Sequence, residues 1–383
     1  MAMIDGVRDT NTIIAATRKL DTADRIALLE PDAAPLTVIL KMARKRKTTD
    51  PKFRWFEDVL GPRWDTVNYS TGYTTSETSI VVDNGAYFKA NDLVKVTTTA
   101  EVVLVTAVST NTLTVTRAFG ETAAGAVADG GKLLILGNLS EEGADAPAIK
   151  TTQKVEVYNF TTIVRTPLGL TGTEAATDLY GEKDLPYQRR KAAIEHMKDI
   201  ENRFLFSERK EDTSGTHPKR STRGLIKWIT TNVTDAGNTL TEAEFNTFLE
   251  SVFRYGSKKK MLIACSKIVS ALDSWGRAAV RVLSKDQTYG ISVKQYLTSH
   301  GTLNVTKHDL LEEFYNETGF ALEPASMWYR PLQGAKNRDT HLRKNIQDNK
   351  NDSEQDEWMT EVGLHLEHQK KHGRLHNVDQ YSA

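Results

Sequence analysis

The chain has 383 residues, of which 39% are hydrophobic and 26% charged, and these ordinary globular values exclude a disordered or membrane-embedded class. Lys plus Arg and Asp plus Glu each number 50, so the formal net charge is zero and the basic excess of a dedicated nucleic-acid-binding protein is missing. Because one hydrophobic core stops growing near ~250–300 residues, the length predicts two or more lobes.

The cysteine content and the N-terminus indicate where the protein is made. A single cysteine, Cys265, lies in an apolar strand-like run, which predicts a buried thiol and excludes an internal disulfide. The first residues lack the apolar centre of a secretory signal, and no run of ~18 apolar residues occurs. The sequence therefore predicts a protein made in a reducing cytosol, with no membrane partner.

Residues 1–50 are expected to form an arm that lies against another copy of the chain. Pro31 and Pro35 divide this region into short apolar segments, because proline lacks a backbone N–H and ends a helix. No partner helix for these segments is evident nearby in the sequence. The residues expected to make intersubunit contacts are Ile26, Leu29, Leu36, Phe53, Trp55 and Phe56.

A basic cluster follows the second apolar segment of the arm. It consists of Lys41, Arg44, Lys45, Arg46 and Lys47. One interpretation is a solvated helix end. The other is contact with phosphate groups or with an acidic partner surface, since such a cluster neutralises phosphates without reading a base sequence.

Residues 70–138 predict a small β-domain. Short β-branched runs occur at 80–82, 93–96, 102–108, 113–115 and 133–136, separated by Gly- and Asn-containing turns. Strands at this spacing are typical of a small sandwich or barrel. Extended sequence on both sides, at 51–69 and 139–172, indicates that this block is an insertion carried on two legs.

The remainder predicts a mixed α+β structure around a long helix at 183–210. Ile194, Met197, Ile200 and Phe204 recur at helical spacing and define its buried face. A capping box at 241–244 opens the next helix, and a strand at 261–265 and a hairpin at 293–305 follow. The segments 360–367 and 369–378 are expected to join the sheet under the long helix.

The sequence contains no convincing catalytic or cofactor-binding motif. The segment 125–132 resembles a phosphate loop, but Leu133 stands where Ser or Thr would have to hold magnesium. Four histidines, His365, His368, His372 and His376, stand close together, and on a helix the last three would share a face and could bind zinc or nickel. However, Gly373 interrupts such a helix and Leu364 and Leu366 alternate as in a strand, so a solvated strand is favoured. We therefore expect a non-enzymatic protein with no catalytic residue, no cofactor and no metal site.

The order of segments resembles the major capsid protein of tailed phages of the Hong Kong 97 type. The local likeness is carried by LEPDAAPL at 29–36, PKFRWFED at 51–58, EVGL at 361–364 and NV at 377–378, and it extends over 1–69 and 139–383. The resemblance implies an α+β capsid fold with an N-terminal arm at 1–50 and an E-loop on legs 51–69 and 139–172, enlarged by the β-domain at 70–138. It further implies a P-domain at 173–240 with the spine helix, an A-domain at 241–340, and a return to the P-domain at 341–383.

The same resemblance implies a function and a set of partners. Copies of the chain would form pentamers and hexamers in the icosahedral head of a double-stranded DNA phage, assembled in the host cytoplasm. No long helical pre-segment is visible, so a separate scaffolding protein is implied, together with a portal and packaged DNA that is not read by sequence. Three alternatives stay open at this point: a non-viral nanocompartment shell, a nucleic-acid-binding protein using 41–47, and a metal-dependent enzyme using 365–376.

Overall fold

The computed structural model describes residues 34–143, 145–147, 149–177, 184–279, 282–288, 291–333 and 338–382. The chain divides into two compact units, one formed by Met1–Trp55 with Val157–Ala383 and the other by Phe56–Glu156. Two of the expected contact residues, Ile26 and Leu29, lie outside the described part of the chain. Within that part, no helix combines the length and the apolar character that a membrane crossing needs.

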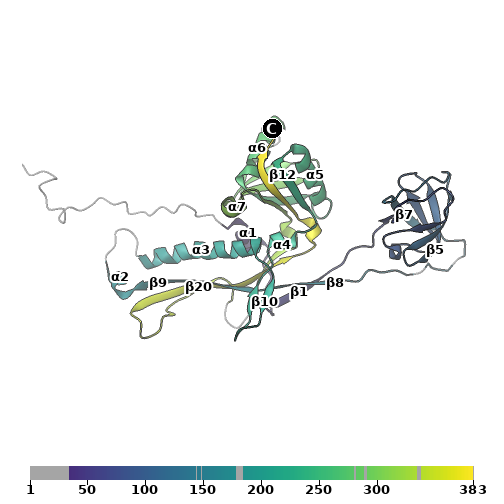
Figure 1. The fold of residues 1–383 in the computed structure, drawn as a ribbon. Coiled ribbons are helices and arrows are strands. Elements are labelled where there is room, and N and C mark those ends of the chain that lie inside the picture. Colours follow the sequence, from purple (N-terminus) through teal and green to yellow (C-terminus); the bar gives the residue numbers. More distant parts are fainter. Residues whose placement is uncertain are drawn as a thin grey trace, which may run out of the picture. The chain divides into compact units, whose positions relative to one another are not determined.

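The unit Phe56–Glu156 is a small antiparallel barrel (Figure 1). Its six strands are β2 (Trp64–Thr66), β3 (Ser79–Val81), β4 (Asp92–Val96), β5 (Val102–Ser109), β6 (Thr112–Thr116) and β7 (Lys132–Asn138), in the order β2-β7-β4-β5-β6-β3. An antiparallel bridge between Val67 and Val82 joins the two outer strands and closes the sheet. Alternate residues fill the interior, because successive strand side chains point to opposite faces.

All five strands predicted between residues 80 and 136 are present, and the interior of the barrel is apolar. The core includes Ile80, Phe88, Val94, Val105 and Leu113, each at most 1% exposed. The unit begins earlier than residue 70, since β2 and Val67 complete the closure. That this unit is an addition to a smaller capsid fold stays a prediction.

The unit formed by Met1–Trp55 and Val157–Ala383 contains a four-stranded antiparallel sheet, and the long helix α3 (Asp184–Phe206) lies along it. The strands are β9 (Thr162–Thr171), β18 (Met327–Pro331), β19 (His341–Arg343) and β20 (Ser353–Leu366). Figure 1 shows α3 running along β9 and β20, as the expected spine helix should. The indole N–H of Trp358 on β20 donates to the Arg189 carbonyl at 3.0 Å, and Arg189 Nε donates to Asp356 at 2.6 Å, so polar contacts also fix α3 to this sheet.

Two predicted boundaries around the helix are wrong. The segment 162–171 is not part of a leg, because β9 pairs with β20 over ten residues. The helix ends at Phe206 rather than at 210, where the chain turns into the hairpin β10 (Lys210–Asp212) and β11 (Lys219–Ser221). The returning chain packs closely against the end of α3, since a Cβ on Gly224 would lie 2.7 Å from the Ser207 nitrogen.

A seven-stranded mixed sheet with helices forms the other part of this unit. Its order is β12 (Val233–Leu240), β21 (Gly373–Tyr381), β17 (Gly319–Leu322), β13 (Lys259–Ala264), β16 (Thr302–Lys307), β15 (Ile291–Leu297) and β14 (Val282–Thr288). Helices α5 (Glu242–Phe253) and α6 (Ser266–Ala279) pack on its strands, and α4 (Leu225–Trp228) and α7 (Asp309–Phe314) are short. The capping box of Thr241 and Glu244, the hairpin around Gly301 and the burial of Cys265 are confirmed.

The C-terminal strand does not lie where the sequence predicted. Strand β21 pairs with β12 and β17, so both β12 and β21 belong to the seven-stranded sheet rather than to the sheet under α3. The chain changes sheets at His368, which has a left-handed backbone (φ 51°), and at the single turn Gln369–Lys371. A Cβ on Gly373 would lie 2.3 Å from a Val252 methyl, so only glycine lets β21 start this close to α5.

Candidate assembly surfaces

The described end of the predicted arm packs against its own chain. Helix α1 (Pro35–Ala43) buries Leu36 and Leu40 completely. The carboxylate of Glu201 on α3 accepts the backbone N–H groups of Leu36 at 2.9 Å and Thr37 at 2.7 Å. These first N–H groups have no partner inside a helix, and a negative charge at that end is favourable. Leu36 is therefore buried within its own chain, and the contact with a neighbouring copy expected for it stays a prediction.

Glu201 also joins α3 to the seven-stranded part of the unit. His308, which precedes α7, donates from Nε2 to Glu201 at 2.7 Å, while its Nδ1 accepts the Leu310 N–H at 3.2 Å. The Thr37 hydroxyl is a further donor to the same carboxylate. Glu201 and His308 are both fully buried. One buried carboxylate therefore connects three segments that are far apart in the sequence.

Phe53 and Trp55 likewise lie in the core of their own chain. They belong to strand β1 (Lys52–Glu57), which pairs with β8 (Val155–Phe160), and they are 3% and 8% exposed. The Trp55 ring stacks on His365 with centroids 4.0 Å apart and contacts Trp228 at 5.6 Å. Both rings are thus buried by their own chain, and the role between subunits expected for them stays a prediction. Phe56, the next outward-facing residue, is 66% exposed and stays available for such a contact.

The basic cluster is partly used by the chain itself. The Arg46 N–H donates to the Tyr329 carbonyl at 3.0 Å and the Tyr329 N–H donates to the Arg44 carbonyl at 2.9 Å, so this segment pairs with β18. Lys45 forms an ion pair with Asp339. Burial lowers the pKa of Lys41, against the opposing effect of Asp339. Arg44, Arg46 and Lys47 remain exposed.

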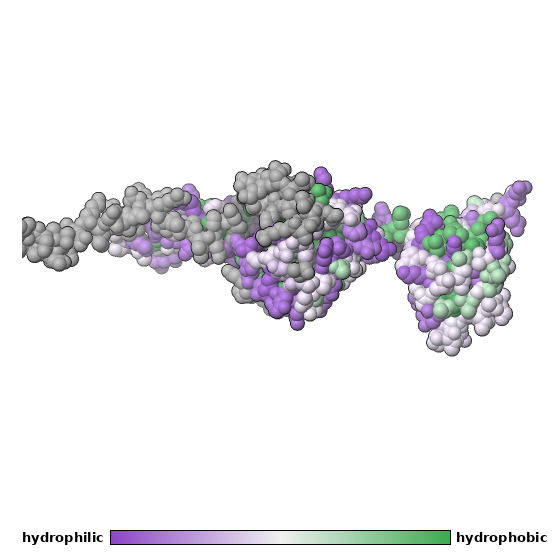
Figure 2. Space-filling view, turned by 90° about the horizontal axis from the view of Figure 1, so that it is seen from above, coloured by the Kyte–Doolittle hydropathy of each residue, from purple (hydrophilic) through white to green (hydrophobic). Residues whose placement is uncertain are grey.

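Large apolar side chains are exposed on the two leg segments, defined here as residues 56–63 and 139–155. They include Phe56 (66%), Leu60 (93%) and Ile149 (89%), together with Val59 and Val155. On the barrel, Trp64 and Leu134 are cross-strand partners and are also exposed. Figure 2 shows hydrophobic residues gathered on the visible surface of the barrel. These exposed side chains form the candidate contact surface of the chain.

The sequence did not predict the buried polar residues His196 and Glu201 on α3. His196 lies between the hydroxyls of Thr166 at 2.8 Å and Thr360 at 2.7 Å, and burial lowers its pKa to about 4. His196 stands four residues before Ile200 and eight before Phe204, so the helical spacing that identified the apolar face also includes it. Glu201 gave no comparable signal, because its partners come from distant segments.

Two of the four C-terminal histidines are buried rather than solvated. His365 and His372 are buried, at 1% and 0% exposure, so the expected solvated strand is wrong for both. Burial lowers the pKa of each to about 3, which keeps them neutral in the folded chain. Among the described residues, no group of three or more His, Cys, Asp or Glu side chains is arranged to hold a metal ion.

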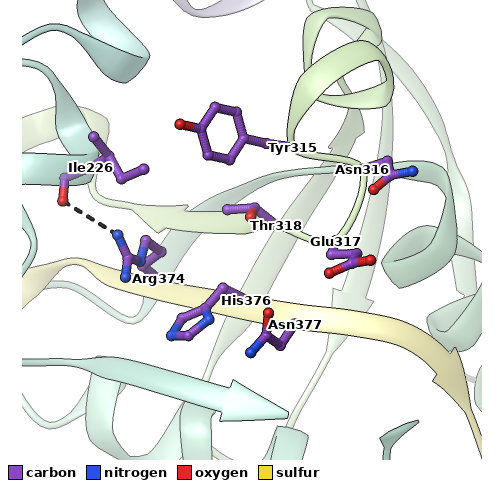
Figure 3. Close-up of a pocket in the computed structure, with 8 residues that line it drawn as sticks. All are labelled: Ile226, Tyr315, Asn316, Glu317, Thr318, Arg374, His376 and Asn377. Atoms are coloured by element: carbon purple, nitrogen blue, oxygen red, sulfur yellow. Dashed lines mark hydrogen bonds between the residues drawn. The ribbon is translucent and has the colours of Figure 1, made fainter. Parts of the chain in front are cut away.

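A polar pocket of about 370 Å³ opens beside the start of β21 (Figure 3). Arg374 and His376 come from β21, and Tyr315 and Glu317 come from the loop after α7. The Tyr315 ring is fixed by stacking on Phe206 at 4.4 Å. Burial lowers the pKa of the Arg374 guanidinium. In Figure 3 the Arg374 and His376 side chains lie near each other, with Glu317 toward the opposite end of the pocket.

Comparisons with known proteins agree on one family and one fold. Residues 7–379 match the family model of the SU10 major capsid protein. A major capsid protein of Pseudomonas phage PaMx41 is 25% identical over 225 residues, which is 55% of this chain and 54% of the relative, so the match spans about half the relative's length.

Solved capsid structures show the same fold despite low identity. The capsid asymmetric unit of cyanophage A-1(L) has a TM-score of 0.56 at 10% identity, over 97% of this chain and 100% of the other. The structure of Microbacterium phage Oxtober96 has a TM-score of 0.50 at 8% identity, over 96% and 97%. The fold is that of tailed-phage capsid proteins of the Hong Kong 97 type. With nearly its whole length matched by the family model, the chain belongs to the SU10 major capsid protein family.

Proposed function

We propose that many copies of this chain assemble into the icosahedral head of a tailed phage that packages double-stranded DNA. The observation that carries the proposal is the exposure of Phe56, Leu60 and Ile149 on the leg segments. Burying such a side chain against a neighbouring copy contributes ~1.5–3 kcal/mol. A chain that repeats this contact many times in a shell gains stability that no isolated subunit has.

The family assignment supports a structural role without catalysis and a location in the virion. In the proposed head, Phe56–Glu156 is the enlarged E-loop, the α3 sheet is the P-domain, and the seven-stranded part is the A-domain. The exposed cations Arg44, Arg46 and Lys47 face packaged DNA or an acidic partner, without reading bases. A scaffolding protein and a portal complete the assembly, made in the host cytoplasm. The nanocompartment alternative is disfavoured by the phage family match.

The test is assembly of the full chain, with and without a candidate scaffolding protein, followed by sedimentation and electron microscopy. The wild type should form closed shells, and Leu60→Ser combined with Ile149→Ser should leave folded, unassembled subunits. Lys154→Ser, an exposed polar change on the same legs, is the matched control and should assemble normally. A wild type that stays monomeric under all these conditions, or a double variant that assembles like the wild type, would contradict the proposal.

A further inference from the structure

The guanidinium of Arg374 has unused hydrogen-bonding capacity at the pocket beside β21. Its Nη1 donates to the Ile226 carbonyl at a long 3.4 Å, drawn as the dashed line in Figure 3. Its Nε is buried and has no hydrogen-bond partner in the part of the chain that the structure describes. An arginine carries five N–H donors and no acceptor, and buried donors without partners are costly. Arg374 also lines the open pocket, where the remaining Nη donors of the guanidinium can take an acceptor.

Three carboxylates at or next to the pocket are engaged elsewhere. Asp235 accepts Asn377 Nδ2 at 3.0 Å and the Gly237 N–H at 2.9 Å. Lys267 donates to Asp379 at 2.6 Å and also lies 3.9 Å from Glu317. Within the described residues, no ion pair is formed by Arg374. The chain thus places a guanidinium in an open pocket and directs its own neighbouring acids to other partners.

We propose that this pocket receives a carboxylate side chain from a neighbouring copy of the chain. The proposal rests on the assembly described under the proposed function. A planar guanidinium binds a carboxylate through two parallel N–H donors. The Tyr315 hydroxyl and the His376 ring lie at the same pocket and supply further polar contacts.

A singly charged acid fits this pocket better than a phosphate. Glu317 lies toward the other end of the pocket, where it would repel a doubly charged ligand more strongly than a carboxylate. A copy of the same chain is the suitable source, because every subunit in the proposed shell has such neighbours. The contact would fix the orientation of adjacent subunits, since complementary charges set register more than affinity.

The first test compares three variants in shell assembly. Arg374→Gln should lower the yield of shells about tenfold or more, because a charged partner is left unpaired. Arg374→Lys should restore only part of the yield, since an ammonium group cannot present two parallel N–H donors to a carboxylate. Tyr315→Phe keeps the ring stack on Phe206 and removes only the hydroxyl, so a modest loss is expected. Unassembled subunits of each variant should unfold like the wild type.

The second test is a density map of the wild-type shell, which also decides the matter if Arg374→Gln does not fold. A carboxylate of an adjacent copy within hydrogen-bond reach of the guanidinium is the expected result. Solvent alone, a phosphate group, or a residue of a different protein in the pocket would overturn the proposal, as would normal assembly of all three variants. If shells form but the pocket holds no carboxylate of a neighbouring copy, only this proposal fails and the proposed function stands. If the wild type forms no shells, the proposed function itself is refuted.

Discussion

Glu201 is the residue whose change should most clearly separate the arm segment from the rest of the subunit. One carboxylate oxygen accepts the Leu36 N–H and His308 Nε2, and the other accepts the Thr37 N–H and hydroxyl. In Glu201→Gln one of these oxygens becomes an NH₂ group that faces two donors. At least two charge-assisted hydrogen bonds are therefore lost in a fully buried place.

The cost follows from the number of bonds lost. A hydrogen bond to a charged group contributes ~1.5–3 kcal/mol, so two of them correspond to about 3–6 kcal/mol of unfolding free energy. Thr37→Val is the matched control, because it removes one hydroxyl donor in the same place, leaves the carboxylate with three partners, and should cost about 1 kcal/mol.

The assay combines urea unfolding of the unassembled subunit with limited trypsin digestion. Because α1 contains Lys41 and leads directly into the segment 44–47, Glu201→Gln should expose these sites and speed cleavage there. Thr37→Val should be cut at nearly the wild-type rate. If Glu201→Gln changes neither the unfolding free energy by more than about 0.5 kcal/mol nor the cleavage rate, then the carboxylate does not hold the arm and the reasoning is refuted.

Two further predictions concern buried polar groups. The pKa of His196 is about 4 in the folded chain, against 6.5 for an unperturbed histidine. As the pH falls, the unfolded state therefore binds a proton before the folded state does. The stability of the folded chain should then fall by up to about 3 kcal/mol from pH 6.5 to pH 4. His196→Gln should flatten the dependence of stability on pH in this range, whereas His300→Gln, at an exposed histidine, should not. An unchanged slope in both variants would show that His196 does not cause the loss of stability. In the barrel, Arg117 donates to Glu101 at 2.9 and 2.8 Å in a buried pair, so Arg117→Ala should cost about 3–5 kcal/mol. In Arg117→Ala, hydrogen exchange should rise across the barrel but not in α3. The control Arg220→Ala breaks a partly exposed ion pair and should cost about 1 kcal/mol or less. Equal losses of stability in the two variants would contradict a stabilising role of the buried Arg117–Glu101 pair.

Local patterns in the sequence identified most of the elements, because their signals are short-range. The strands of the barrel follow from alternation and turns, and the capping box at Thr241 fixes the start of α5. The apolar face of α3 was predicted from spacing, and Ile200 and Phe204 are indeed fully buried. Each of these features is determined within about ten residues of chain.

Features that depend on distant partners were missed. Strand β21 looked like a continuation of β20, and only the left-handed His368 and the tight fit of Gly373 against α5 send it to another sheet. The burial of Leu36 depends on Glu201, which lies 165 positions along the chain. For the candidate surfaces, the sequence could place apolar residues near the legs, but it could not tell which of Phe53, Trp55 and Phe56 face outward.

The division between inward and outward apolar residues bears on how a shell of this chain would assemble. Leu36, Phe53 and Trp55 stabilise the subunit itself, whereas Leu60 and Ile149 contribute nothing to its core and are free to stabilise contacts with neighbours. Under the proposed function, folding and assembly would therefore rest on different side chains of the same chain. Because each exposed leg residue adds only ~1.5–3 kcal/mol when buried, a single wrong contact remains reversible, while many correct contacts in a closed shell add up. Changes on the legs should accordingly alter shell formation and leave the unfolding of the isolated subunit unchanged.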